Sequence, residues 1–129
     1  MSYLSKVRIG VTKEGLRFLE DYSMEKLGED KYLNSCMNNY KVFIEKGNIR
    51  YIGWDWIDFC ENNLDVKVIY EALDVMDKEE IPYRMAIVGE DYMEYGAIEI
   101  KDNDPFDIIP YILTTIEFVY GDEHLREEE

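Results

Sequence analysis

The stretch of sequence that decides the fold is residues 51–60, which read Tyr51-Ile52-Gly53-Trp54-Asp55-Trp56-Ile57-Asp58-Phe59-Cys60. It holds both tryptophans of the chain. From Trp54 onward a strand-like alternation gives way to helical spacing, because Trp56, Phe59 and Cys60 fall on one face of a helix. We therefore predict a helix that begins near Trp54. Trp56 is expected to pack in the core, whereas the pattern leaves open whether Trp54 points inward or outward.

A second helix is predicted directly after residues 62–64. Asp65 is a suitable N-cap residue for it. Apolar residues then recur at steps of three and four, namely Val66, Ile69, Leu73 and Met76. The helix should end within residues 78–80, because Ile81 precedes Pro82 and is disfavoured in the helical conformation. The apolar face of this helix pair is expected to anchor a sheet.

The residues at the start of the chain predict a strand followed by a helix. Apolar residues alternate with Arg8 and Gly10 over residues 7–11, which is the period of a half-buried strand. Thr12 then fits the N-cap position of a helix. This helix should run to about residue 27, because the next residue, Gly28, is a typical helix stop.

A hairpin is predicted between this helix and residues 51–60. Segments 41–45 and 49–52 are β-prone, and Lys46-Gly47-Asn48 between them is typical of a tight turn. Residues 29–40, which precede the hairpin, indicate only a short helix or an irregular turn.

The last third of the chain is rich in β-branched and aromatic residues. Three strands are predicted there, at residues 83–88, 95–100 and 111–120. Ile98 and Ile100 are expected to point inward, and residues 101–105 have the composition of a turn. The charged residues 121–129 should form a mobile tail unless a partner holds them.

These elements predict one acidic α+β domain over residues 1–120, followed by the charged tail. The expected architecture is an antiparallel or mixed sheet of five to six strands with two or three helices packed on one face. The expected order is strand, helix, a possible short helix, two strands, two helices and three strands. A chain of 129 residues is long enough to bury one core of this kind.

The net charge of −15 is concentrated in the later part of the chain. Residues 1–50 hold seven acids against nine bases, whereas residues 51–129 hold twenty-two acids against five bases. Such asymmetry favours a positively charged protein partner and disfavours direct binding to nucleic acid or to an anionic membrane. The acidity could also serve solubility alone. The chain carries no apolar signal core or spanning segment, so a cytoplasmic protein is expected.

The sequence offers little for catalysis. The only histidine, His124, lies in the charged tail, and the two cysteines form no Cys-x-x-Cys pair, so neither a nucleophilic triad nor a zinc site is expected. No glycine-rich phosphate-binding motif occurs. The acidic segment 102–107 departs from the calcium-loop pattern. We therefore expect no enzyme, metal or cofactor, although a small enzyme or metal-binding protein that uses this segment remains a third possibility.

The spacing of the acids gives a sharper hypothesis. Carboxylates at steps of three or four on a helix lie about 5–6 Å apart. This separation is close to the spacing of phosphates along a nucleic-acid strand, roughly 7 Å along the backbone path. The tyrosines of residues 90–95 are set among acids and suit contact with arginine. The candidate partner-binding residues are Asp55, Asp58, Glu61, Glu71, Asp74, Asp77, Glu90, Asp91, Tyr92, Glu94 and Tyr95.

In size, acidity and lack of catalytic residues the chain is similar in composition to the small inhibitors that phages and mobile elements direct against host nucleases, including anti-CRISPR and anti-restriction proteins. This resemblance rests on composition and not on a motif. It implies a non-enzymatic protein that inhibits a basic nucleic-acid-binding enzyme by mimicking nucleic acid. The alternative is an immunity protein or antitoxin that neutralises one cognate toxin. A homodimer is compatible with either function.

Overall fold

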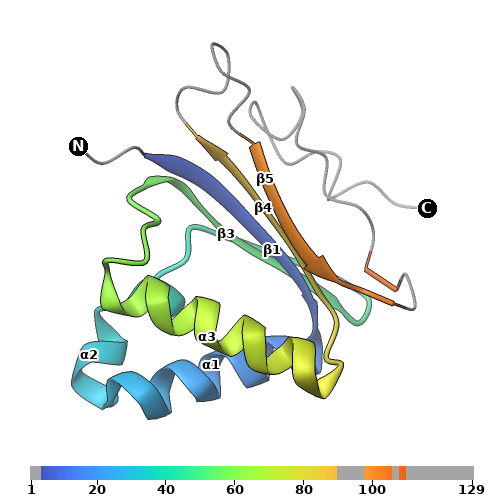
Figure 1. Cartoon of the computed structure of the whole chain (residues 1–129), viewed down its shortest axis with the longest axis horizontal. Helices are drawn as coiled ribbons and strands as arrows, with labels where there is room; N and C mark the ends of the chain where they lie inside the picture. The colour runs from blue at the N-terminus through green and yellow to red at the C-terminus, as the bar shows by residue number, and fades with distance from the viewer. Residues whose placement is uncertain (1–3, 90–97, 106–107, 110–129) are drawn as a thin grey trace.

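The described residues form one antiparallel sheet with helices packed on one of its faces (Figure 1). The structure is a computed structural model, and it describes residues 4–89, 98–105 and 108–109. Across the sheet the strands follow the order β2-β3-β1-β4-β5, and every neighbouring pair is antiparallel. Along the chain the elements are β1 (Ser5–Thr12), α1 (Lys13–Leu27), α2 (Glu29–Leu33), the 3-10 helix η1 (Cys36–Asn38), β2 (Val42–Lys46), β3 (Ile49–Ile57), α3 (Leu64–Glu79), β4 (Tyr83–Gly89) and β5 (Ile98–Asn103).

The predicted α+β class and the five-stranded sheet are confirmed, whereas the predicted helix count is only partly right. The predicted pair of helices after the hairpin is a single helix, α3, and the ambiguous region before the hairpin contains α2 and η1. The predicted strand at 111–120 and the tail at 121–129 lie outside the described residues.

The central strand β1 is buried on both faces, so the predicted half-buried strand is wrong in this respect. Val7, Ile9 and Val11 face the helices and are fully buried among their apolar residues. Arg8 and Gly10 lie on the opposite face and are buried as well. The sequence pattern misleads because a charged residue in an alternating strand usually points to water, whereas Arg8 is 0% exposed.

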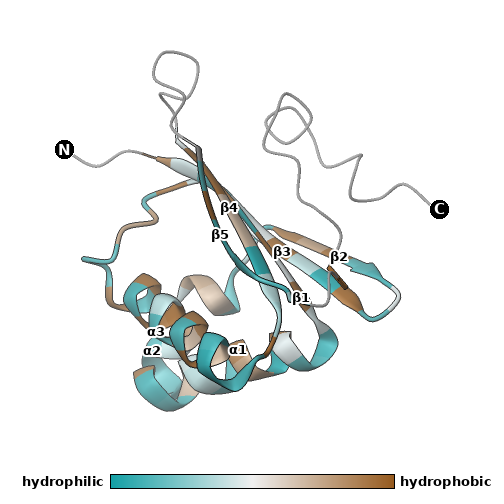
Figure 2. Ribbon diagram, turned by 45° about the vertical axis from the view of Figure 1, so that its right-hand side comes forward, coloured by the Kyte–Doolittle hydropathy of each residue, from teal (hydrophilic) through white to brown (hydrophobic). Residues whose placement is uncertain are grey.

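Helix α1 begins and ends as its sequence predicts. The Thr12 side chain accepts a hydrogen bond from the backbone N–H of Gly15, and this satisfies one of the amides left unpaired at the start of the helix. Gly28 follows Leu27 with a φ of 85°, a backbone conformation that glycine adopts without steric cost. The helix packs beside α3, and hydrophobic and hydrophilic residues alternate along both helices (Figure 2).

The predicted hairpin is confirmed, with Gly47 at a φ of 61° in the turn between β2 and β3. Strand β3 does not end at Ile52 but continues to Ile57, so the predicted helix from Trp54 is wrong. Trp54 pairs with Val7 of β1 and is only 2% exposed. The ladder that β3 forms with β1 extends over this segment and overrides a short helical periodicity, since a sequence pattern does not include tertiary pairing.

The structure decides the orientation of Trp54, which the sequence left open, and reverses the one expected for Trp56. The Trp54 indole is buried, and its Nε1 donates a hydrogen bond to the backbone oxygen of Cys36 at 2.9 Å. Trp56, which was expected in the core, is 41% exposed. The assignment of Trp56 as a core anchor is therefore wrong. Phe59 is partly buried against the helix-facing core, but from a loop and not from a helix.

Helix α3 supplies the apolar face that the sequence predicts. Its buried residues include the four predicted ones, Val66, Ile69, Leu73 and Met76. The helix starts at Leu64 after Asn63, so Asp65 is not the N-cap residue. Instead, the Asp65 carboxylate accepts the backbone N–H groups of Val66 and Cys36, both at 2.9 Å, and links α3 to η1. The helix ends at Glu79, within the predicted range.

The last two described strands agree only partly with prediction. Strand β4 is confirmed, whereas β5 runs to Asn103 and occupies part of the predicted turn at 101–105. Ile100 is 48% exposed, so its predicted inward orientation is wrong. It lies opposite Ala86 on the sheet face that the helices do not cover. Among the described strands β5 has a neighbour on one side only, and such a strand can leave an apolar side chain exposed.

Candidate functional site

The candidate acidic residues do not form one helical stripe. Asp55 lies on β3, Asp58 and Glu61 lie in the loop that follows, and only Glu71, Asp74 and Asp77 share a helix, α3. The remaining candidates lie outside the described residues, and they are Glu90, Asp91, Tyr92, Glu94 and Tyr95. The predicted row of carboxylates from 55 to 77 is therefore divided into two parts, because β3 takes the place of the expected first helix.

The Asp55 side chain is partly exposed, and its carboxylate forms ion pairs with two other residues of the chain. Its Oδ1 lies 2.9 Å from Nη2 of Arg8 and 3.8 Å from Nζ of Lys6. The Arg8 guanidinium is fully buried and also donates from Nη1 to the backbone oxygens of Val7 and Trp54, at 3.0 and 3.1 Å. Asp55 thus holds a buried cation in place. Sequence reasoning missed Arg8, whose only signal was a charged residue within an apolar strand.

The loop between β3 and α3 carries acids of a different kind. Asp58 is half-buried and Glu61 is exposed. Neither carboxylate has an ion pair with any described residue. The backbone of the loop is held by Asn63, whose side-chain amide donates to the backbone oxygen of Asp58 at 2.8 Å. These two charges are therefore not neutralised by the part of the chain that is described.

The acids of α3 face outward and meet one cation of the sheet. Lys101 on β5 lies 3.8 Å from Asp74 and 3.6 Å from Asp77, and the two aspartate side chains are 68% and 39% exposed. Asp77 also accepts a hydrogen bond from the Tyr83 hydroxyl at 3.0 Å. Burial and this hydrogen bond raise the pKa of Tyr83. Glu71, one turn earlier, is half-buried and adds a third carboxylate.

Acidic residues also lie at the C-terminal end of α3, where negative charge is unfavourable. Glu79 and Glu80 are exposed there, beside one basic residue, Lys78. Negative charge at this end opposes the helix macrodipole. Glu80 also adopts a φ of 58°, a conformation that costs a residue other than glycine about 1 kcal/mol. The acidity of this end is therefore retained against local stability.

Two tyrosines near the core predict a loss of stability at alkaline pH. Burial raises the pKa of Tyr40 and of Tyr70 to about 12, and the nearby charges of Glu20 and Glu99 add to the respective shifts. Because the folded-state pKa lies above the unfolded value of about 10, the stabilising effect is complete below pH 10 and is lost as pH rises toward 12.

We expect the urea midpoint of unfolding to fall between about pH 10 and pH 12 and to fall less in Tyr70→Phe. Circular dichroism at fixed pH values on both sides of pH 10 measures this change. Equal pH dependence of the wild type and the variant would contradict the assignment to Tyr70.

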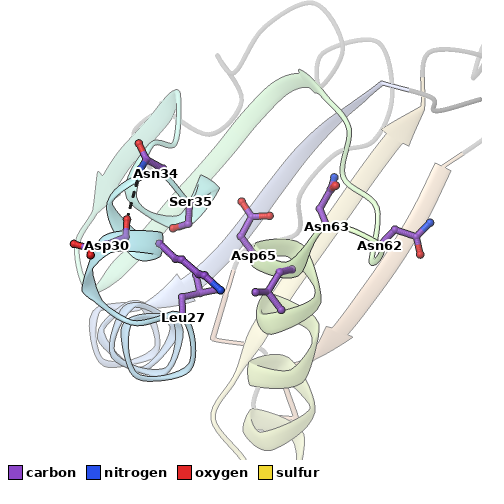
Figure 3. Close-up of a pocket in the computed structure, with 9 residues that line it drawn as sticks. Leu27, Asp30, Asn34, Ser35, Asn62, Asn63 and Asp65 are labelled. Carbon is purple, nitrogen blue, oxygen red and sulfur yellow. Dashed lines mark hydrogen bonds between the residues drawn. The ribbon is translucent and has the colours of Figure 1, made fainter.

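An open pocket of about 740 Å³ lies between α2 and the start of α3 (Figure 3). Its polar groups are amides, carboxylates, one hydroxyl and one lysine, which suit hydrogen bonding. The lining residues are Leu27, Asp30, Lys31, Asn34, Ser35, Asn62, Asn63, Leu64 and Asp65. Sequence reasoning missed this pocket, although the asparagines at 62–63 were visible as a helix boundary.

Thiol chemistry is not favoured beside this pocket. Burial and then the charge of Asp65 raise the pKa of Cys36, so its sulfur is held as the protonated, weakly nucleophilic thiol.

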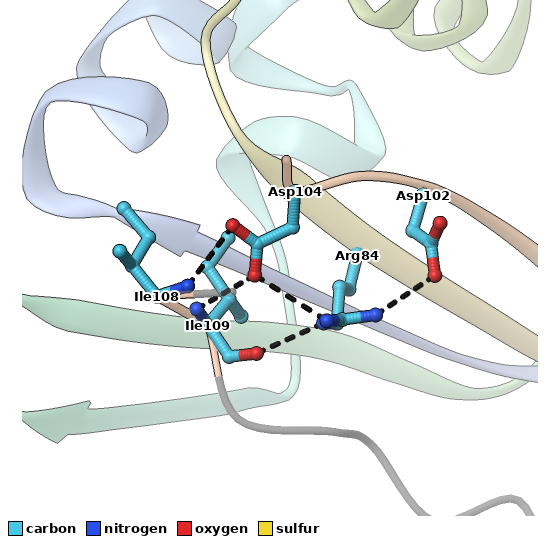
Figure 4. A network of polar contacts seen from close by, with 5 residues as sticks. All are labelled: Arg84, Asp102, Asp104, Ile108 and Ile109. Carbon is cyan, nitrogen blue, oxygen red and sulfur yellow. Dashed lines mark hydrogen bonds and ion pairs between the residues drawn. The ribbon is translucent and has the colours of Figure 1, made fainter. Parts of the chain in front are cut away.

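Two acids at the end of β5 and just after it, Asp102 and Asp104, form ion pairs with Arg84 (Figure 4). Arg84 lies 2.9 Å from Asp102 and 3.5 Å from Asp104, and its Nε donates to the backbone oxygen of Ile109. Asp104 also accepts the backbone N–H groups of Ile108 and Ile109, at 3.1 and 2.8 Å. Asp102 and Asp104 thus have structural partners. Among the described residues, no group of three or more potential ligands is placed to hold a metal ion.

The described residues form an α+β protein with outward acids on α3 and on the loop before it, as well as on α1 and α2. Comparison of the chain with family models, with curated proteins and with solved structures finds no match. Within the described part of the chain, every helix is too short or too polar to cross a membrane.

Proposed function

We propose that the protein is a non-enzymatic acidic binding protein that inhibits a basic nucleic-acid-binding enzyme. The observation that supports this function best is the outward acidic side of α3, formed by Glu71, Asp74 and Asp77. The acids that follow at the end of the helix oppose its dipole, so the charge there is not explained by helix stability. Among the described bases, Lys101 alone forms ion pairs with this side of α3, at Asp74 and Asp77.

The spacing on α3 suits mimicry of nucleic acid. Side chains three residues apart on a helix lie about 5–6 Å from each other, close to the separation of successive phosphates. A basic channel that binds phosphates would therefore accept this row of carboxylates, and long-range attraction would speed their association. The partner is a basic protein, and neither nucleic acid nor a membrane binds directly. An anti-CRISPR or anti-restriction protein of phage type, acting in the cytoplasm, fits this function.

Removing the charge of α3 tests this proposal. We expect the triple variant Glu71→Gln, Asp74→Asn, Asp77→Asn to fold normally and to bind its nuclease at least about tenfold more weakly, with a shallower salt dependence. The matched control is Asp21→Asn, Glu25→Gln, Glu29→Gln, which removes the same charge from exposed positions of α1 and α2.

The measurement is binding to a panel of purified CRISPR and restriction nucleases at low and high salt, with and without their nucleic acid. Competition between the protein and the nucleic acid is the expected result. An equal effect of the two triple variants would show that total charge matters and α3 does not. Tight binding that nucleic acid does not displace would favour the immunity or antitoxin function instead.

A further inference from the structure

Trp56 lies in an irregular part of β3. Ser5 of β1 pairs with Ile57 and Val7 pairs with Trp54, so two steps along β1 correspond to three along β3. The extra residue is accommodated in a β-bulge at Asp55 and Trp56. Bulges change the direction in which a side chain points, and they occur often beside functional sites.

The backbone of Trp56 is strained and its ring is accessible. Its φ of 56° is left-handed, which is a genuine outlier for a bulky residue. Glycine or asparagine would fit this position with less strain. The side chain is nevertheless a tryptophan and is 41% exposed, whereas Trp54 is 2% exposed and has a hydrogen-bond partner. Strain of this kind is a recognised sign of a binding position.

The residues before and after Trp56 in the chain are acidic. The Asp55 carboxylate pairs with Lys6 and Arg8 through its Oδ1 atom, and the side chain remains 42% exposed. Asp58 and Glu61, in the loop that follows the ring, have no ion pair with a described residue. Asp58 and Glu61 follow Trp56 by two and five residues in the chain. An indole face combined with nearby acids suits a guanidinium, which stacks on the ring and pairs with the carboxylate.

We propose that Trp56 is the aromatic platform for an arginine side chain of the basic partner, with Asp58 and Glu61 supplying the opposite charge. This inference rests on the proposed function and names a contact within it. It distinguishes arginine from lysine, because the planar guanidinium stacks on an indole and the compact, strongly hydrated ammonium does so less well. Phosphate-like charge on α3 alone would not make this distinction.

The test uses two defined probes, nona-arginine and nona-lysine peptides, which carry equal charge. We expect the wild-type protein to bind nona-arginine more tightly, and acrylamide quenching of the exposed tryptophan to fall when this peptide binds. In Trp56→Asn, whose asparagine suits the left-handed backbone, affinity for nona-arginine should fall about fivefold while affinity for nona-lysine is unchanged. Trp56→Tyr should retain most of the preference.

The matched control is Phe43→Asn, which removes an aromatic ring of similar exposure, 44%, from the edge strand β2. It should leave the arginine preference unchanged. Equal affinities of the wild type and Trp56→Asn for nona-arginine, or an unchanged quenching curve, would overturn the inference. A wild-type protein that prefers nona-arginine through Trp56 but binds no nuclease of the panel would instead overturn the proposed function.

Discussion

Gly53→Ala is expected to lower the free energy of unfolding by about 3 kcal/mol. Gly53 lies on β3 opposite Arg8 of β1. A Cβ atom there would lie 2.5 Å from the backbone oxygen of Val7 and 2.7 Å from Cδ of Arg8. The carbonyl belongs to the central ladder of the sheet and cannot move aside alone, so the strands must separate or the arginine must leave its place. Urea unfolding followed by circular dichroism measures the change.

The matched control for this prediction is Gly47→Ala. Gly47 has a φ of 61° in the hairpin turn, and no atom lies within 4 Å of an added Cβ. Its cost should therefore be the conformational term alone, about 1 kcal/mol. If the two variants lose equal stability, the close contact between β1 and β3 does not account for the cost of Gly53→Ala.

Local signals allowed much of the fold to be predicted. The cap at Thr12, the stop at Gly28 and the turn at Gly47 each depend on a few neighbouring residues, and all three are confirmed. The apolar face of α3 is confirmed because a sixteen-residue helix contains several turns of its period. At residues 54–57 the helical pattern was too short to compete with strand pairing to β1, a contact between residues far apart in the sequence, and residues 58–60 lie in the loop that follows.

The candidate site was predictable to the extent that it depends on one helix. The acids of α3 share a side because helical spacing fixes their relation, and this could be read from the sequence. The role of Asp55 could not be read from the sequence. Its partner Arg8 is 47 residues away in the chain, and the two meet only because of the register between β1 and β3. The sequence pattern assigned the same binding role to the six candidate acids of residues 55–77. The strand register shows that Asp55 differs from the others, because it pairs with the buried Arg8.

Asp55→Asn is expected to lower the free energy of unfolding by about 2 kcal/mol, unlike the neutralisation of an exposed acid. The substitution leaves the Arg8 guanidinium buried with a weaker partner at a distance of 2.9 Å. The cost is smaller than for a fully enclosed pair, because the Asp55 side chain is 42% exposed. Asp74→Asn, at a position 68% exposed, should change stability by less than about 0.5 kcal/mol and serves as the control.

A double-mutant cycle with Arg8→Met separates the ion pair from the effects of each side chain alone. If Asp55 acts by neutralising Arg8, its replacement in the Arg8→Met background should cost much less, with a coupling energy of about 1–2 kcal/mol. Additive effects would mean that Asp55 stabilises the fold by another route. A stable Asp55→Asn variant that fails to bind the partner would return Asp55 to the binding surface, because loss of binding without loss of stability is expected only for a residue that contacts the partner.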